Sequence, residues 1–184
     1  MRSIAFVTAA ALTLSAALSA LPASAQTPAP GQAAGEHEFL TPDQLEWQPA
    51  PPGLPPGAEI AVLRGDPGGT DGTFAMRLRV PAGYYVAPHS HPTAENLTLV
   101  SGSMRYGMGD EADEAQTTEL PAGTYIFLPE GHTHYVWAGD EGFVLEIQAA
   151  APFDITYVDP ANDPREAQAQ ADTSPGTTPG QSAQ

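Results

Sequence analysis

Apolar residues between positions 58 and 148 recur at every second position in short stretches, and turn-forming residues separate these stretches. The pattern predicts strands at 58–63, 73–80, 84–87, 96–100, 103–108, 117–120, 124–128, 134–138 and 142–148. A period of two with no sustained helical repeat predicts an all-β domain. This many short strands on about a hundred residues favour a double-sheet jelly roll or a related small barrel.

Alternation within the predicted strands assigns side chains to the two faces. In 73–80 the apolar residues share one face, which leaves Arg77 and Arg79 on the outside. In the strand that begins near residue 96, Leu97 and Leu99 share the parity of Glu95, so we expect that carboxylate on the inner face. The same rule places four apolar side chains outside: Val86, Val100, Tyr135 and Trp137. We expect this surface either to form a homodimer or, in a monomer, to be covered by the proline-rich segment from Phe39 to Pro56.

The amino-terminal residues resemble a secretory signal. Residues 4–21 carry no charge and are followed by Ala23-Ser24-Ala25, a small-residue cleavage pattern. The alternative is a membrane anchor, but threonine, serine and Pro22 interrupt the apolar run. We therefore expect residues 1–25 to be removed, and the mature protein to be periplasmic or secreted and not bound to the membrane.

Composition divides the remainder of the chain. Residues 26–36 are rich in alanine, proline and glutamine and predict a flexible leader, whereas 37–57 predict a proline-rich strap across the domain. The folded domain is expected at 58–158. Residues 159–184 contain little to bury and predict a disordered tail.

Missing residue types exclude several classes of chemistry. The chain has no cysteine and no lysine, which excludes disulfides, thiolate ligands and Schiff-base catalysis. Its net charge of −16 disfavours binding to nucleic acid and to anionic membrane surfaces. Small molecules and cations remain as expected partners.

The histidines indicate a metal site. Of five in the chain, four lie in two short segments, His89 with His91 and His132 with His134. Two histidines at i and i+2 share one face of a strand, and Glu95 keeps the same parity. Imidazole and carboxylate without thiolate suit one divalent transition metal ion, with Fe, Mn, Ni, Cu and Zn all compatible.

These residues also resemble the motifs of the cupin superfamily. The chain is similar to the small members of that superfamily that have a single domain. The first motif is matched by Gly83, His89, His91, Glu95 and Gly102, and the second by Gly123, Pro129, Gly131 and His134. The second motif normally closes with an asparagine that binds no metal, and Ala138 stands there. The resemblance covers about 58–152 and implies a double-stranded β-helix, with His89, His91, Glu95 and His134 as the metal ligands.

Other residues are candidates for the surroundings of the metal. His132 shares the parity of His134, but its position in a turn favours the second shell over direct ligation. Tyr84 and Tyr106 are candidates for the pocket, as is Gln148 if the parity of its strand is reversed. The acidic run 110–114 lacks the spacing of a calcium loop and favours a solvated hairpin. No catalytic residue is assigned.

Two functions follow from this site. One is a small exported metalloenzyme, in the dioxygenase, decarboxylase, isomerase or lyase class, acting on a small molecule that ligates the metal through oxygen. The alternative is a non-catalytic periplasmic module that binds or senses a metal or a small ligand. No arginine is expected on the inner face, so substrate binding would depend on the metal and on apolar walls.

Overall fold

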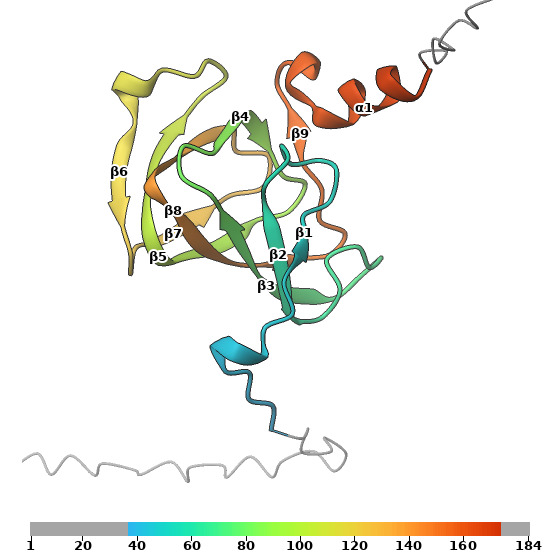
Figure 1. Ribbon diagram of the computed structural model, residues 1–184, viewed down its shortest axis with the longest axis vertical. Coiled ribbons are helices and arrows are strands. Elements are labelled where there is room, and N and C mark those ends of the chain that lie inside the picture. The colour runs from blue at the N-terminus through green and yellow to red at the C-terminus, as the bar shows by residue number, and fades with distance from the viewer. Residues whose placement is uncertain (1–36, 174–184) are drawn as a thin grey trace, which may run out of the picture. The chain divides into compact units, whose positions relative to one another are not determined.

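The computed structural model describes residues 37–173, and its strands curl round a common interior (Figure 1). The expected signal peptide and leader, 1–25 and 26–36, lie outside the described residues. The strands are β1 (Gln48–Pro49), β2 (Glu59–Arg64), β3 (Thr73–Val80), β4 (Tyr85–Ser90), β5 (Glu95–Met108), β6 (Thr118–Pro121), β7 (Tyr125–Leu128), β8 (His134–Ala150) and β9 (Thr156–Tyr157). The helices are η1 (Pro42–Gln44), η2 (Glu114–Gln116), η3 (Pro160–Asn162) and α1 (Pro164–Thr173). The predicted all-β jelly roll is confirmed.

Two long strands connect the layers of the fold. β5 and β8 pair antiparallel from Glu95 opposite Ala149 to Met108 opposite His134. One half of this ladder is extended by β3, β2 and β1 on the β8 side and by β7 on the β5 side. The other half is extended by β4 and β9, and by β6. The sequence predicted four short strands here, because glycines interrupt the alternation at the points where β5 and β8 bend.

Gly102 and Gly142 lie at that bend. Both have positive φ, +76° and +71°, and the register of the ladder shifts on either side of Gly102. A Cβ atom on Gly102 would lie 2.1 Å from the carbonyl oxygen of Gly142. The two backbones therefore approach more closely than any side chain allows, and glycine is required for both conformation and space.

The inner faces of the strands form the core. Burial in β3 alternates as predicted, with its four apolar residues inside. Arg77 and Arg79 lie outside, where they pair with Glu146 and Glu59. The core includes the buried side chains of Phe74, Leu97, Leu99, Met104, Phe143 and Ile147.

The expected outward apolar surface needs correction at Val86. A register irregularity in β4 separates Val86 from His89, so both residues face inward although they are three positions apart. Tyr135 does face outward, but the loop at Asp113 covers it and leaves 1% exposed. Trp137 stacks on Tyr85 at 4.6 Å between ring centroids. Of the four residues only Val100 is exposed, and homodimer formation stays a prediction.

The range 159–184 is not entirely a disordered tail. It contains η3 and α1, which follows β9 in Figure 1 and extends to Thr173. The Asp163 carboxylate accepts a hydrogen bond from the backbone of Arg165 at the start of α1. The Arg165 side chain bonds residues of the domain, an anchor that apolar content alone does not reveal. Residues 174–184 lie outside the described range, and no helix within 37–173 is long and apolar enough to span a membrane.

We expect Gly102→Ala to lower the free energy of unfolding by about 3 kcal/mol or more, because backbone strain and a steric clash add. Gly123→Ala is the matched control, since Gly123 also has positive φ, +90°, but open space where the Cβ would lie. Urea denaturation of both variants measures the difference. Equal losses would show that the close approach to Gly142 does not constrain the bend.

Candidate metal centre

Three histidines converge at one end of the barrel. His89 in β4 is the direct cross-strand partner of His134 at the start of β8, and their ring centroids are 4.1 Å apart. His91 follows β4, with its ring centroid 5.0 Å from His89 and 5.5 Å from His134. One ring nitrogen from each histidine lies within 4.8 Å of the others. Together these nitrogens form a group that could hold a metal ion.

Backbone carbonyls orient all three rings. The Nδ1 atoms of His89, His91 and His134 lie 2.7, 2.7 and 3.1 Å from the carbonyl oxygens of Ala87, Asp154 and His132. A carbonyl oxygen only accepts, so each Nδ1 carries the proton and each Nε2 keeps a free lone pair. Such an outer hydrogen bond is the arrangement that fixes metal-binding imidazoles.

Burial keeps the three imidazoles neutral. His89 and His134 are each 4% exposed. Desolvation lowers the pKa of His89 to about 2 and that of His134 to about 4, and it also lowers the pKa of His91. Neutral imidazole is the form that binds a metal, so the site needs no deprotonation of histidine at neutral pH.

Glu95 provides the acidic member of the site. It is 2% exposed, and its Oε2 lies 3.8 Å from Nε2 of His91. Desolvation raises the pKa of this carboxyl to about 8. A cation beside it would stabilise the ionised form, since a buried carboxylate requires a partner of opposite charge. The structure thus places Glu95 beside His91, whereas the group that could hold a metal ion consists of His89, His91 and His134. Imidazole is a ligand that suits a divalent transition metal.

The three histidines and Glu95 line a cavity of about 490 Å³ with apolar walls. Representative wall residues are Ile60, Met76, Leu78, Val86, Leu97 and Leu145. The lining residues that are exposed to solvent include Pro51, Pro52, Gly68 and Asp154, which places the cavity mouth there. A ligand at the histidines would therefore be surrounded mainly by hydrocarbon.

Tyr106 supplies a polar group to this cavity. Its ring stacks on His134, with centroids 5.6 Å apart. Its hydroxyl is buried and, among the described residues, is the buried side-chain polar atom that has no hydrogen-bond partner. Desolvation and the nearby Glu95 raise the pKa of Tyr106, so the hydroxyl stays protonated. A buried donor without an acceptor suggests a ligand that provides one.

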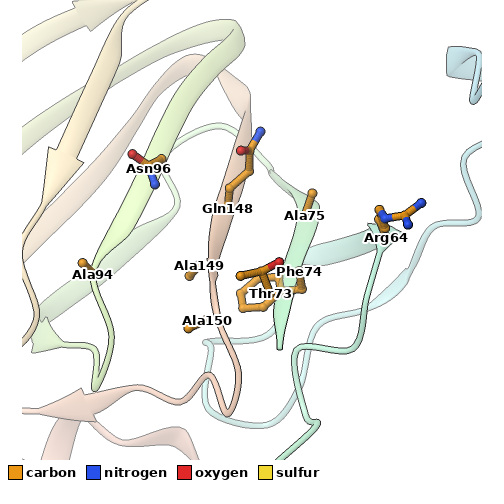
Figure 2. Close-up of a pocket in the computed structure, with 9 residues that line it drawn as sticks. All are labelled: Arg64, Thr73, Phe74, Ala75, Ala94, Asn96, Gln148, Ala149 and Ala150. Atoms are coloured by element: carbon orange, nitrogen blue, oxygen red, sulfur yellow. The ribbon is translucent and has the colours of Figure 1, made fainter. Parts of the chain in front are cut away.

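The other predicted residues lie away from the ligand group. His132 is half-buried, and the contribution it makes to the site is its backbone carbonyl, which accepts from His134. The Tyr84 hydroxyl donates to the carbonyl of Pro55 and ties the strap to the barrel. Gln148 faces outward beside Asn96 and lines a separate depression on the outer surface (Figure 2). The alternation of β8 therefore holds, and the idea that Gln148 reaches the metal is wrong.

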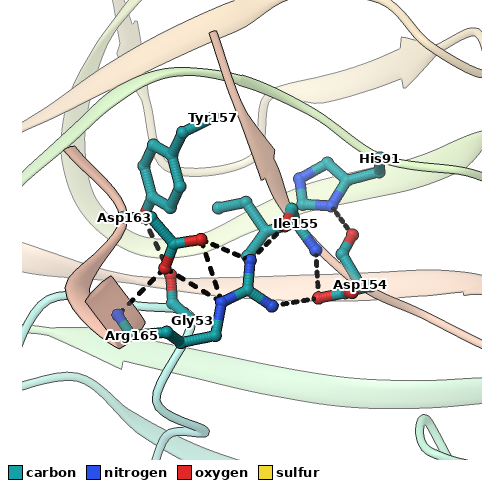
Figure 3. Close-up of polar contacts among 7 residues, drawn as sticks. All are labelled: Gly53, His91, Asp154, Ile155, Tyr157, Asp163 and Arg165. Carbon is teal, nitrogen blue, oxygen red and sulfur yellow. Dashed lines mark hydrogen bonds and ion pairs between the residues drawn. The ribbon is translucent and has the colours of Figure 1, made fainter. Parts of the chain in front are cut away.

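Sequence reasoning missed the segment that supports His91. The ring of His91 stacks on Phe153, with ring centroids 4.7 Å apart. Its Nδ1 bonds the backbone carbonyl of Asp154 (Figure 3). Arg165 in turn bonds the Asp154 side chain. A backbone carbonyl 63 residues from its histidine leaves no signal in spacing or residue type.

The chain belongs to the ChrR cupin-like family, whose domain matches residues 36–150. Among solved structures it is similar to the polyketide cyclase RemF from Streptomyces resistomycificus, with a TM-score of 0.58 and 20% identity over 73% of this chain and 94% of that one. The DMSP lyase DddQ from Ruegeria pomeroyi is similar with a TM-score of 0.50 and 22% identity over 62% and 61%. No curated protein has significant sequence similarity. These likenesses establish the cupin fold.

We expect the stability of the metal-free protein to be greatest near pH 6.5 to 7. Below pH 6.5 the unfolded histidines bind protons that the folded ones, with lowered pKa values, do not, so stability falls as the pH decreases. Between about pH 4.5 and 8 folded Glu95 retains its proton while the unfolded residue loses it, so its contribution falls as the pH rises.

Above about pH 7 the glutamate effect dominates, and we expect a loss of up to about 1 kcal/mol by pH 8. Urea denaturation of chelator-treated protein across pH 5 to 8.5 measures this curve, and Glu95→Gln should remove the decline on the alkaline side. An alkaline decline of the same size in Glu95→Gln would mean that another group causes it.

Proposed function

We propose that this protein is an exported mononuclear metalloenzyme that acts on a small, largely apolar molecule bearing a metal-ligating oxygen. The observation that carries the proposal is the set of three neutral imidazoles, each with Nε2 free, at an apolar cavity of about 490 Å³. Dioxygenases, decarboxylases, isomerases and lyases are the reaction classes in scope. Export rests on the signal-like residues 1–25.

Different residues of the cavity would bind the ion, the hydrocarbon part of the substrate and a second substrate oxygen. His89, His91, Glu95 and His134 would hold the ion, which when bound supplies a Lewis acid for a substrate oxygen. The apolar walls would bind the hydrocarbon part of the substrate and exclude water. Tyr106 would donate a hydrogen bond to a second oxygen, because this residue lines the cavity and its buried hydroxyl has no partner.

The arginines named below are already bonded to other groups, which favours an uncharged or weakly charged substrate. Arg77, Arg79 and Arg105 pair with carboxylates outside the cavity. Arg165 reaches the cavity, but its guanidinium bonds Asp163, Asp154 and the carbonyl of Ile155. Bidentate recognition of a substrate carboxylate would require breaking these bonds. A compact dicarboxylate such as oxalate is therefore a poorer candidate than a phenol or a flavonol.

We expect His134→Ala to lose stoichiometric metal and His132→Ala to keep it. The two histidines are two residues apart, but only His134 offers a ring nitrogen to the group. Elemental analysis of protein matured in its own compartment, beside both variants, measures the metal content. Equal content in the two variants, or no metal in the unmodified protein, would contradict the metal site.

We expect turnover with one reloaded ion. Metal-free protein is loaded in turn with Fe, Mn, Ni, Cu or Zn, and product formation and dioxygen uptake are followed with a phenol, a flavonol and oxalate. Turnover that is absent in His134→Ala would support the metalloenzyme. Stoichiometric metal with tight ligand binding but no turnover for any ion would favour the non-catalytic binding or sensing module.

We expect Tyr106→Phe to weaken binding of the phenol or flavonol by about fivefold, because one hydrogen bond of about 1 kcal/mol is lost. Stability should be unchanged or slightly higher, since the unpartnered hydroxyl is removed. Titration calorimetry on the metal-loaded protein gives the affinity. Tyr125→Phe is the control, because that hydroxyl bonds Asn96 on the surface; an equal effect there would refute a role for Tyr106.

A further inference from the structure

We propose that Arg165 is a positioning residue that holds residues 153–155, here called the mouth segment, against His91 and at the mouth of the cavity. This inference rests on the proposed metal site, because His91 is one of its ligands. It assigns a role to α1, a helix that lies outside residues 36–150, the range of the family match.

The Arg165 guanidinium bonds three groups at once (Figure 3). Nη1 donates to Oδ1 of Asp154 at 2.9 Å, and Nη2 donates to the carbonyl of Ile155 at 2.8 Å. Nε and Nη2 also bond the carboxylate of Asp163, at distances of 2.8 to 3.0 Å. Four of its five N–H donors can be used in this way, which only a planar fork can do.

The mouth segment contacts His91 on two sides. The Asp154 carbonyl accepts from Nδ1 of His91 at 2.7 Å. Phe153 stacks on the same ring, with an interplanar angle of 8°. His89 and His134 bond carbonyls only two residues away, within their own strand or turn. His91 is therefore the histidine whose orientation depends on a distant segment, and Arg165 bonds both Asp154 and Ile155 of that segment.

The strap meets the mouth segment at the entrance to the cavity. Residues 51–54 of the strap line the cavity together with residues 153–155 and Arg165. A Cβ atom on Gly53 would lie 2.8 Å from Cγ2 of Ile155, so the Gly53 backbone packs closely against the Ile155 side chain. The Tyr157 hydroxyl donates to the carbonyl of Gly53 at 2.9 Å. Displacing the mouth segment would widen this entrance.

Loss of Arg165 should loosen the mouth segment without unfolding the barrel. On one side, the backbone N–H of Phe153 donates to the carbonyl of Pro67. On the other side, β9 pairs with β4 at His89 and Ser90. These bonds are independent of Arg165, and no barrel strand contains it.

The test compares Arg165→Gln with Arg105→Gln in the full chain. Arg105 is the matched control because it is exposed to a similar extent, 42% against 39%, and also pairs with a carboxylate, that of Glu114. The pair lies on β5 and η2, and neither residue lines the cavity. Both variants lose one positive charge, which by itself favours binding of a cation, and more so at Arg165 because that residue lines the cavity. Weaker binding in Arg165→Gln would therefore not be a charge effect.

We expect Arg165→Gln to weaken Co²⁺ binding by about tenfold, the lower end of the range for outer-shell changes, while Arg105→Gln leaves it unchanged. Chelator competition at a temperature well below unfolding measures the affinity, and the visible spectrum of bound Co²⁺ reports the ligand geometry. Arg165→Lys should recover little, because an ammonium cannot span three acceptors.

A second readout needs no metal. Amide hydrogen exchange of residues 154–157 in the metal-free protein should be faster in Arg165→Gln than in Arg105→Gln. If the two variants agree in both readouts while the unmodified protein binds Co²⁺, the role of Arg165 is refuted and the metal site stands. If the unmodified protein binds no Co²⁺, the proposed function fails, and so does the proposal that Arg165 positions His91 as a ligand. Faster exchange in Arg165→Gln would then support only the statement that Arg165 holds the mouth segment in place.

Discussion

The site depends on the continuous ladder between β5 and β8 and on its bend at Gly102 and Gly142. Glu95 and His134 each begin one of these strands, so in a straight antiparallel pair they would lie at opposite ends. The bend turns one half of the ladder over the other and brings both ends to one cavity. Because neither bend position tolerates a Cβ atom, the geometry of the ligands depends on two glycines remote from them.

Backbone groups supply the hydrogen bonds that orient the imidazoles. A carbonyl held in a strand or a tight turn has little freedom, so it fixes a ring without loss of side-chain entropy. For His89 and His134 this support is local in sequence, whereas for His91 it comes from the segment after β8. The site thus combines two histidines set by the barrel with one set by a segment that α1 anchors.

Much of the fold and the clustering of the three histidines follow from the sequence, for identifiable reasons. Alternation in β3 assigned every residue to its correct face, and the spacing of His89, His91 and Glu95 placed three candidate ligands on adjoining ends of β4 and β5. Alternation failed at Val86, where a register irregularity adds a residue that no local pattern marks. It also divided β5 and β8 in two, because a glycine at a bend and a glycine in a turn are identical in sequence.

The carboxy-terminal part could not be predicted, because it is held by polar bonds and not by an apolar face. Arg165 is an ordinary surface residue by composition, and only the fold shows that Asp154 and Ile155 lie within its reach. The His91 bond is likewise made to a carbonyl, a group that every residue carries.

The net charge of this protein favours cations, whereas the interior of its cavity is mainly apolar. A net charge of −16 favours the approach of cations, yet the cavity interior is hydrocarbon with one carboxyl group that burial keeps protonated up to about pH 8. A divalent ion bound to the three imidazoles would reverse that preference, since the ionised carboxylate then has a counter-charge. Metal binding and ionisation of Glu95 are therefore coupled. An anionic ligand would face a protein of the same sign outside and few donors inside, whereas an uncharged oxygen ligand meets neither barrier.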